Sequence, residues 1–206
     1  MDVFVPFDPR DPNSRLSSVL SADQRRAFAA AMLTDVLDAI RATGREPTIL
    51  STADLDRSCA VVVDDRPLTE AVNGVLDATT PAAVVMADLP LVTPEAVDRL
   101  LDADAAVTLA PGLGGGTNAL CARHPGFRVD YHDGSYRKHL ASAEECGASV
   151  HTLDSFRLAV DVDERADLAE VLLHGEGEAA AWLRDAGFEI EITDGRCTVS
   201  TAAGGR

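Results

Sequence analysis

Residues 82–90, with the sequence AAVVMADLP, decide the fold class of this chain. Residues 82–87 form a nearly unbroken apolar run, which predicts a β-strand that is buried on both faces. Asp88 follows this run directly, and Pro90 closes the segment. In open α/β sheets, ligands bind at the carboxyl ends of the strands. Asp88 is therefore the first candidate for a functional carboxylate, and its alternative role is that of an ordinary turn residue.

Predicted strands and helices alternate on both sides of this segment. Ser21 with Gln24 has the pattern of a capping box, and Pro67 and Pro94 stand where helices begin. Short apolar runs predict strands at 3–7, 48–51, 60–63, 105–110, 117–122, 150–153 and 158–162. Helical spacing predicts helices at 21–42, 68–78, 136–146, 165–173 and from 94 onward. This alternation predicts a three-layer α/β/α fold around a mostly parallel central sheet.

A second group of carboxylates lies at Asp161 and Asp163, at the end of the predicted strand 158–162. Residues two apart on a strand point to the same face, so these carboxylates are expected to lie side by side. Adjacent carboxylates repel each other unless a cation lies between them, and oxygen ligands suit Mg²⁺. Together with Asp88 they predict a metal site for a polyphosphate. The alternative is a strand end in which Asp163 caps the next helix.

Two further segments offer groups that bind anions. Residues 112–116 form a glycine-rich loop whose backbone can approach a phosphate closely, and Thr117 and Asn118 follow it with side-chain donors. Ser135 opens a predicted helix, and a helix N-terminus attracts anions. His139, on the same helix, is the one histidine expected near these residues. The structural alternatives are a surface loop and an ordinary helix cap.

The charge of the chain excludes some partners. Its 34 acidic residues outnumber 18 basic residues, the formal net charge is −16, and Lys138 is the only lysine. This balance argues against binding nucleic acid or an anionic membrane, since both need clustered basic groups. It suggests instead a protein that stays soluble at high salt.

The length of 206 residues suits a single domain over 1–206. Within it, Asp194 and Gly195 form a typical hairpin turn, so we predict a C-terminal hairpin appendage over 187–200, followed by a loose tail.

The first residues lack the charged and apolar segments of a signal peptide, and no apolar run is long enough to span a membrane. We therefore predict a cytoplasmic protein.

Five of these segments together resemble one family. In chain order they are SRL at 14–16, MADLPL at 86–91, GGTNAL at 115–120, SYRKH at 135–139 and DVD at 161–163. This combination resembles the CofC family, the 2-phospho-L-lactate guanylyltransferases of deazaflavin coenzyme F(420) biosynthesis. The similarity runs from about Val3 to Leu173.

The resemblance implies a nucleotidyltransferase fold of the glycosyltransferase-A or molybdopterin-nucleotidyltransferase kind, in a homodimer. It implies transfer of GMP from GTP to 2-phospho-L-lactate, giving lactyl-2-diphospho-5′-guanosine and pyrophosphate. At the matching positions, Asp88, Asp161 and Asp163 would hold Mg²⁺. Thr117 and Ser135 would contact the phosphorylated acid.

The nucleotide would be held by the first loop and by a later segment. The family's first loop carries lysines where this sequence has Asp8 and Asn13, so Arg10 and Arg15 become the expected phosphate ligands. We expect Arg15 to grip the triphosphate and to share the catalytic role with Asp88.

Guanine is expected against residues 65–73, near Leu68 and Asn73. Asn118 is expected to orient the acceptor acid. A phosphate monoester has a second pKa near 6 and is largely dianionic at neutral pH, so its oxygen can attack the α-phosphorus of GTP without a protein base.

Several alternatives stay open at this point. The acceptor could be phosphoenolpyruvate or 3-phosphoglycerate, or the chain could be another nucleotidyltransferase of this fold that acts on a sugar phosphate or molybdopterin. A non-catalytic GTP-binding protein of the same fold is a further possibility.

Overall fold

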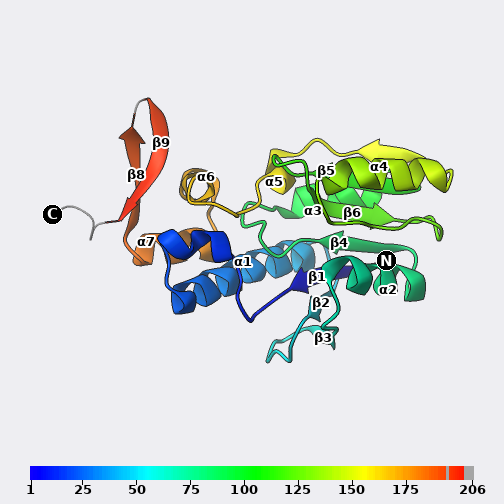
Figure 1. Ribbon diagram of the computed structural model, residues 1–206, viewed down its shortest axis with the longest axis horizontal. Coiled ribbons are helices and arrows are strands. Elements are labelled where there is room, and N and C mark those ends of the chain that lie inside the picture. The colour runs from blue at the N-terminus through cyan, green and yellow to red at the C-terminus, as the bar shows by residue number, and fades with distance from the viewer. Residues whose placement is uncertain (194, 202–206) are drawn as a thin grey trace.

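The computed structural model describes residues 1–193 and 195–201, and a seven-stranded sheet forms its centre. The strands are β1 (Asp2–Phe7), β2 (Pro47–Ser51), β3 (Ala60–Val63), β4 (Ala82–Val85), β5 (Val107–Pro111), β6 (Thr117–Ala122) and β7 (Val150–Thr152). Their order in the sheet is β3-β2-β1-β4-β6-β5-β7 (Figure 1). β6 runs antiparallel to β4 and β5, while the other neighbouring pairs are parallel. The predicted, mostly parallel sheet is confirmed.

Helices cover both faces of this sheet. They are η1 (Ser14–Ser18), α1 (Ala22–Ala42), α2 (Leu68–Ala78), α3 (Pro94–Asp102), α4 (Ser135–Glu145), α5 (Phe156–Ala159), α6 (Asp167–His174) and α7 (Glu178–Asp185). Apolar side chains of α1 and α3 share one core cluster with one face of the strands. Those of α2 and α4 share a second cluster with the opposite face. These layers confirm the predicted α/β/α architecture.

Strand β4 shows why the apolar run at its position decides the fold. All its residues are buried, and alternate side chains enter opposite clusters. Ala83 and Val85 pack toward α1 and α3, while Ala82 and Val84 pack toward α2 and α4. A central strand with a helical layer on each side needs apolar residues at successive positions.

The helix starts follow their predicted signals. At the start of α1, the Gln24 backbone N–H donates to Ser21 Oγ (3.3 Å), and the Ser21 N–H donates to Gln24 Oε1 (2.9 Å). This is the predicted capping box. At the start of α3, the Thr93 side chain accepts a hydrogen bond from the Ala96 N–H, and Pro94 occupies the first helical position.

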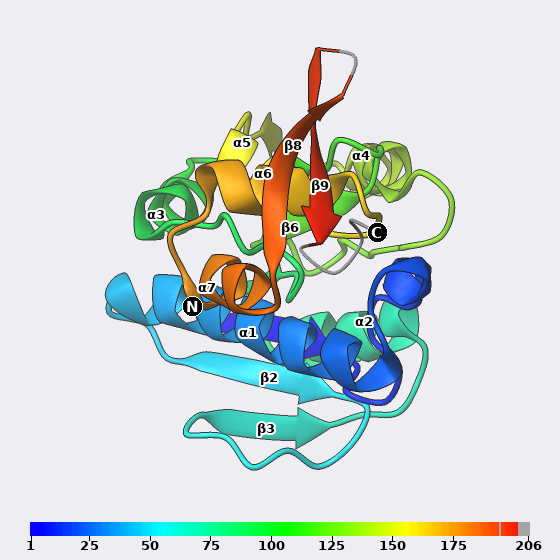
Figure 2. The same ribbon diagram turned by 90° about the vertical axis from the view of Figure 1, so that its left-hand side faces the viewer.

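The C-terminal part builds a third core cluster at one end of the sheet. The predicted hairpin is present as β8 (Phe188–Thr193) and β9 (Arg196–Thr201), which pair in a sheet of their own. Figure 1 shows this hairpin at one end of the molecule, away from the central sheet, and in the turned view of Figure 2 it lies in front of that sheet. Its buried Phe188 and Val199 pack with η1, α6, α7 and the first half of α1. The loose tail was expected from Thr201 onward, but Thr201 belongs to β9, and residues 202–206 lie outside the described residues. Helix α7 was not among the predicted elements.

The predicted strand 158–162 is wrong. Residues 156–159 form the short helix α5, residues 160–163 form no regular element, and α6 begins only at Asp167. The Asp167 carboxylate accepts hydrogen bonds from the backbone N–H groups of Asp163 (2.9 Å) and Glu164 (2.7 Å). Asp161 and Asp163 therefore lie in a loop.

Within the described ranges, no helix is both long and apolar enough to cross a membrane.

Candidate active site

The candidate site lies at the topological switch point of the sheet, between β1 and β4. From β1 the chain proceeds to β2 and β3 on one side and then returns to β4 on the other side of β1. Such a switch point leaves a crevice at the carboxyl ends of the two strands. A cavity of about 340 Å³ opens there, and a second cavity of about 470 Å³ shares part of its wall. The shared residues are Pro6, Phe7, Asp8 and Met86.

The reversed direction of β6 brings the glycine-rich loop to the same edge. Ala119 of β6 pairs with Val85 of β4, and the Met86 backbone N–H donates to the Asn118 carbonyl oxygen (2.9 Å). The start of β6 therefore lies beside the end of β4. Leu113 donates its N–H to the Ala159 carbonyl oxygen (3.0 Å), which brings the segment before Asp161 to the same place.

Asp88 lies in the wall of the first cavity. Its Oδ1 is buried and has no hydrogen-bond partner among the described residues. Burial, together with the nearby charges of Asp161 and Asp163, raises the pKa of Asp88 to about 7. A buried carboxylate beside two others is costly unless it is protonated or a cation neutralises it. Asp161 and Asp163 are therefore close enough to Asp88 for their charges to raise its pKa.

Hydrogen bonds, rather than a strand, hold the loop with Asp161 and Asp163 in place. Val162 donates its N–H to the Asp88 carbonyl oxygen (3.1 Å) and accepts a bond from Asn13 Nδ2 (2.8 Å). Asn118 Nδ2 donates to Asp161 Oδ1 (3.1 Å). Asn13 has φ 49°, a left-handed conformation that asparagine tolerates better than most residues. Its positioning role could not be predicted from the sequence.

The side chains of the three aspartates are not arranged as a metal-binding site in this structure. Among the described residues, no group of three or more His, Cys, Asp or Glu side chains has an arrangement that could hold a metal ion. Their chemistry nevertheless fits Mg²⁺, because carboxylate oxygens are hard ligands and Asp88 Oδ1 has no competing hydrogen-bond partner in the part of the chain that the structure describes. Burial also raises the pKa of Asp163, against the opposing effect of Arg15.

The two candidate phosphate-binding arginines lie on different cavities. Arg15 lines the first cavity with Asp88, is largely exposed, and donates from Nη1 to Asp163 Oδ2 (2.8 Å). Arg10 lines the second cavity, where its guanidinium donates to the Thr52 carbonyl oxygen. Arg15 is thus the arginine nearer to the aspartates.

The residues predicted to bind the acceptor are buried and already make hydrogen bonds within the protein. The Thr117 N–H donates to Ser135 Oγ (2.9 Å), and Thr117 Oγ1 lies 2.8 Å from His139 Nδ1. Thr117 and Ser135 are each 3% exposed and line neither of the two cavities above. Asn118 Nδ2 also donates to the Leu158 carbonyl oxygen (3.0 Å). Asn118 therefore positions Asp161 in this structure.

The glycine-rich loop has structural reasons for its glycines. A Cβ at Gly112 would lie 2.5 Å from Asn118 Oδ1, so a larger residue there would push Asn118 away from Asp161. Gly115 has φ +82°, which favours glycine. The loop thus serves the packing of Asn118 as well as any approach to a ligand.

Comparison with known proteins places the chain in a family. Residues 1–201 match the family described as "Guanylyl transferase CofC like". The chain belongs to the CofC family. The 2-phospho-L-lactate guanylyltransferase of Halomicrobium mukohataei is 59% identical over 200 residues, covering 97% of this chain and 98% of the relative. The enzyme of the same name from Natronomonas pharaonis is 57% identical over 199 residues, with the same coverage of both chains.

Solved structures agree on the fold of this CofC chain. A structure described as a nucleotide-diphospho-sugar transferase from Desulfovibrio desulfuricans has a TM-score of 0.75 at 16% identity, covering 90% of this chain and 95% of the other. The 2-C-methyl-D-erythritol 4-phosphate cytidylyltransferase of Thermus thermophilus has a TM-score of 0.51 at 16% identity, covering 89% and 100%. At these identities the likeness shows a nucleotidyltransferase fold alone.

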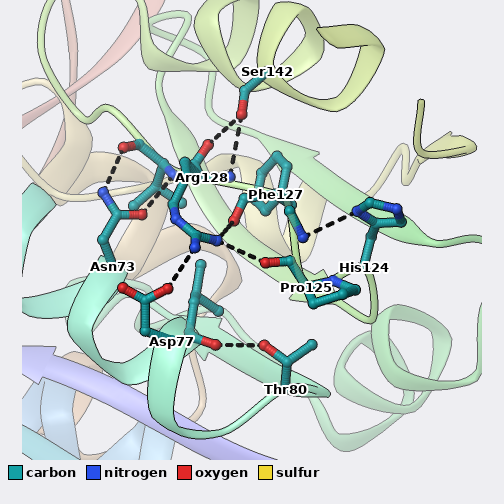
Figure 3. Close-up of polar contacts among 11 residues, drawn as sticks. Asn73, Asp77, Thr80, His124, Pro125, Phe127, Arg128 and Ser142 are labelled. Atoms are coloured by element: carbon teal, nitrogen blue, oxygen red, sulfur yellow. Dashed lines mark hydrogen bonds and ion pairs between the residues drawn. The ribbon is translucent and has the colours of Figure 1, made fainter. Parts of the chain in front are cut away.

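The two residues predicted for guanine binding, Leu68 and Asn73, lie in different surroundings in this structure. Leu68 lines the second cavity, but Asn73 does not. The Asn73 amide is occupied by the Val129 backbone, since its Nδ2 donates to the carbonyl oxygen (3.0 Å) and its Oδ1 accepts from the N–H (2.9 Å) (Figure 3). Five residues along a helix is well over a full turn, which places Asn73 on a different side of α2 from Leu68. In this structure Asn73 therefore contacts the Val129 backbone rather than the cavity that Leu68 lines.

Asn73 belongs instead to a polar network that ties α2 to the segment before α4. In the same close-up, Arg128 pairs with Asp77, and Ser142 Oγ donates to the Arg128 carbonyl oxygen (2.7 Å) (Figure 3). We expect Asn73→Ala to lower the free energy of unfolding by about 1–3 kcal/mol, because the Val129 N–H and carbonyl lose their partners. We expect it to leave the KM for GTP unchanged.

Denaturant unfolding and steady-state kinetics of Asn73→Ala test this assignment. A raised KM for GTP at unchanged stability would contradict it and return Asn73 to the nucleotide site.

Proposed function

We propose that this chain is a guanylyltransferase that transfers GMP from GTP to 2-phospho-L-lactate in coenzyme F(420) biosynthesis, releasing pyrophosphate. The observation that carries the proposal is Asp88, whose buried Oδ1 has no hydrogen-bond partner within residues 1–193 and 195–201, and whose pKa is raised by the nearby charges of Asp161 and Asp163. Such a group, in a cleft at the switch point, suits a metal-bound nucleoside triphosphate. The shared name of relatives that match nearly the whole chain supports the same reaction.

The proposed roles follow from the position of each residue. Asp88, Asp161 and Asp163 would hold Mg²⁺, which neutralises phosphate charge when it is bound. Arg15, on the wall of the same cavity, would bind the triphosphate, since a guanidinium matches phosphate oxygens in geometry and charge. Leu68 in the adjoining cavity would contact the guanine base.

Thr117 and Ser135 would donate hydrogen bonds to the phosphorylated acid, with Asn118 holding Asp161 beside them. No protein base is required, because the attacking phosphate is largely dianionic at neutral pH. Catalysis then depends on the positioning of the two substrates and on the stabilisation of the phosphate charge.

Pyrophosphate release from purified protein in high salt with Mg²⁺ tests the proposal. GTP, ATP and CTP are each combined with 2-phospho-L-lactate, phosphoenolpyruvate and 3-phosphoglycerate. We expect release with GTP and 2-phospho-L-lactate only. Release with another acid would overturn the acceptor, and GTP binding without release in any pair would overturn the enzymatic function.

The role of Arg15 makes a separate prediction. We expect Arg15→Gln to raise the KM for GTP by about 10-fold or more, because a charge-assisted hydrogen bond contributes roughly 1.5–3 kcal/mol. Its exposed ion pair with Asp163 contributes only about 0–1 kcal/mol to stability, so the melting temperature should hardly change.

Initial-rate kinetics and thermal unfolding of Arg15→Gln measure both effects. Arg26→Gln is the matched control, because Arg26 makes an ion pair with Asp23 at the surface of α1 and lines neither cavity. An unchanged KM in Arg15→Gln would contradict the triphosphate role.

Three broader proposals rest on the sequence and on the family. The whole chain would act as one nucleotidyltransferase domain, as a homodimer, in the cytoplasm. Light scattering in high salt measures the oligomeric state, and a monomeric mass would contradict the dimer.

A further inference from the structure

His139 is a buried imidazole beside the proposed acceptor site, and no step of the proposed reaction uses it. It lies on α4 with an exposure of 0%. Tyr131 and Phe127 pack edge-on against its ring, with centroids 5.2 and 6.1 Å away. Both ring nitrogens nevertheless have polar partners, so the orientation of the ring is set by hydrogen bonds as well as by packing.

The hydrogen bonds of His139 determine where its proton is. The Asp130 backbone N–H can only donate, and it lies 2.9 Å from His139 Nε2, so Nε2 is the acceptor and carries no proton. Burial lowers the pKa of His139 to about 4, which leaves the ring neutral at neutral pH. A neutral imidazole has one N–H, so the proton is on Nδ1. Nδ1 therefore donates to Thr117 Oγ1 at 2.8 Å.

This assignment determines the direction of the next hydrogen bonds. Because Thr117 Oγ1 accepts from His139, its own proton is left for another acceptor. Ser135 Oγ likewise accepts from the Thr117 N–H, which leaves the serine proton for another acceptor. In the part of the chain that the structure describes, neither hydroxyl has a second partner. The two hydroxyls thus offer donors, which is the polarity that phosphate and carboxylate oxygens need.

We propose that His139 is a positioning residue that orients the Thr117 hydroxyl as a hydrogen-bond donor toward the phosphorylated acid. The inference deepens the proposed function and rests on it for the identity of the acid. His139 acts through Thr117 and does not touch the substrate. Ser135, which accepts from the Thr117 backbone, provides the second donor of the same pair.

Two substitutions separate the two bonds of His139. The side-chain amide of asparagine ends near the position of Nδ1, so His139→Asn keeps a donor for Thr117 and loses the acceptor for the Asp130 N–H. The longer amide of glutamine ends near Nε2, so His139→Gln keeps that acceptor and loses the donor for Thr117. A purely structural role would make both variants behave alike.

Two readouts are used. Titration calorimetry gives the Kd of 2-phospho-L-lactate without requiring turnover, and pyrophosphate release gives the KM for the acid and for GTP. We expect His139→Gln to weaken acid binding by about 10-fold, as for one lost hydrogen bond to a charged group, with the KM for GTP unchanged. We expect His139→Asn to restore acid binding to within about 3-fold of the natural protein.

A double substitution tests whether the effect passes through Thr117. Thr117→Val removes the hydroxyl, so adding His139→Gln to it should produce no further loss of acid binding. Thermal unfolding of each variant verifies that the protein is folded. Equal losses in His139→Asn and His139→Gln, or additive losses in the double variant, would overturn the inference.

The outcomes also separate this inference from the proposed function. If the natural protein binds 2-phospho-L-lactate and His139→Gln does not weaken that binding, the inference fails while the function stands. If the natural protein binds the acid but releases no pyrophosphate, the function fails while the binding titrations still decide the role of His139. If the natural protein does not bind the acid, both fail.

Discussion

We expect Asp88→Asn to lower kcat/KM for guanylyl transfer by about 10³-fold or more, with the fold intact. The substitution keeps the shape of the side chain but removes the charge that would hold Mg²⁺ against the triphosphate. Losing one preorganised electrostatic group commonly costs about 10²–10³-fold in kcat, and weakened metal binding adds to this loss. Asp161 and Asp163 cannot replace the lost charge, because both are already ligands in the same proposed site.

Pyrophosphate release at saturating Mg²⁺ measures the effect of Asp88→Asn, and circular dichroism verifies the fold. Asp38→Asn is a matched control, since Asp38 makes a surface ion pair with Arg41 on α1. Near-full activity in Asp88→Asn would show that the metal assignment is wrong.

The second large effect concerns the stability of the metal-free protein. The pKa of Asp88 is raised to about 7 in the folded state, whereas an unfolded chain keeps the ordinary value of 3.8. Between these pH values the folded state binds the proton more tightly. The free energy of unfolding therefore falls as the pH rises from about 4 to 7, by up to about 4 kcal/mol from this group.

Denaturant unfolding in the presence of a chelator, at a series of pH values, measures this dependence. Asp88→Asn lacks the carboxyl group, so its stability relative to the natural protein should increase across the same window. Adding Mg²⁺ near pH 8 should stabilise the natural protein and not the variant. A stability difference that does not change with pH would contradict the electrostatic account of Asp88.

The two predictions describe one property of the site. Among the described residues Asp88 Oδ1 has no hydrogen-bond partner, and the charges of Asp161 and Asp163 act on the same carboxylate. This arrangement destabilises the metal-free protein, and the same negative charge is available to a cation. Removing the charge of Asp88 should therefore make the metal-free protein more stable and the enzyme less active, as is common at functional sites.

Much of the fold could be predicted because its signals are local. The apolar run of β4, the capping box of Ser21 and Gln24, and the proline that precedes α2 each lie within a few residues of the structure they determine. The position of Asp88 followed from the same logic, since a charged residue directly after a central strand must lie at the edge of the sheet.

The loop with Asp161 and Asp163 could not be predicted, because its stabilising contacts are distant in sequence. Asn13 binds the Val162 carbonyl from the first loop, and no periodicity near residue 161 reports that bond. Helix α7 is a similar case. The Asp35 carboxylate accepts from the Glu178 and Ala179 N–H groups at the start of α7, although it lies on α1.

The arrangement of the side chains around Thr117 could be expected only in part from the sequence. Spacing placed Ser135 and His139 four residues apart on one helix face, where they can meet the same neighbour. The direction of the hydrogen bonds depends on Asp130, whose N–H determines the tautomer of His139. The position of Asn73 near Leu68 in the sequence carries no information about the bonds that its amide makes to the Val129 backbone.

The reaction itself is tested most directly by following an isotope label. The protein is incubated with GTP, Mg²⁺ and 2-phospho-L-lactate whose terminal phosphate oxygens carry oxygen-18, and the products are examined by phosphorus NMR and mass spectrometry. Our account predicts a new diphosphate with oxygen-18 in its bridge and pyrophosphate without label, because the acid's phosphate attacks the α-phosphorus. Labelled pyrophosphate, or GMP formed beside unreacted acid, would contradict it.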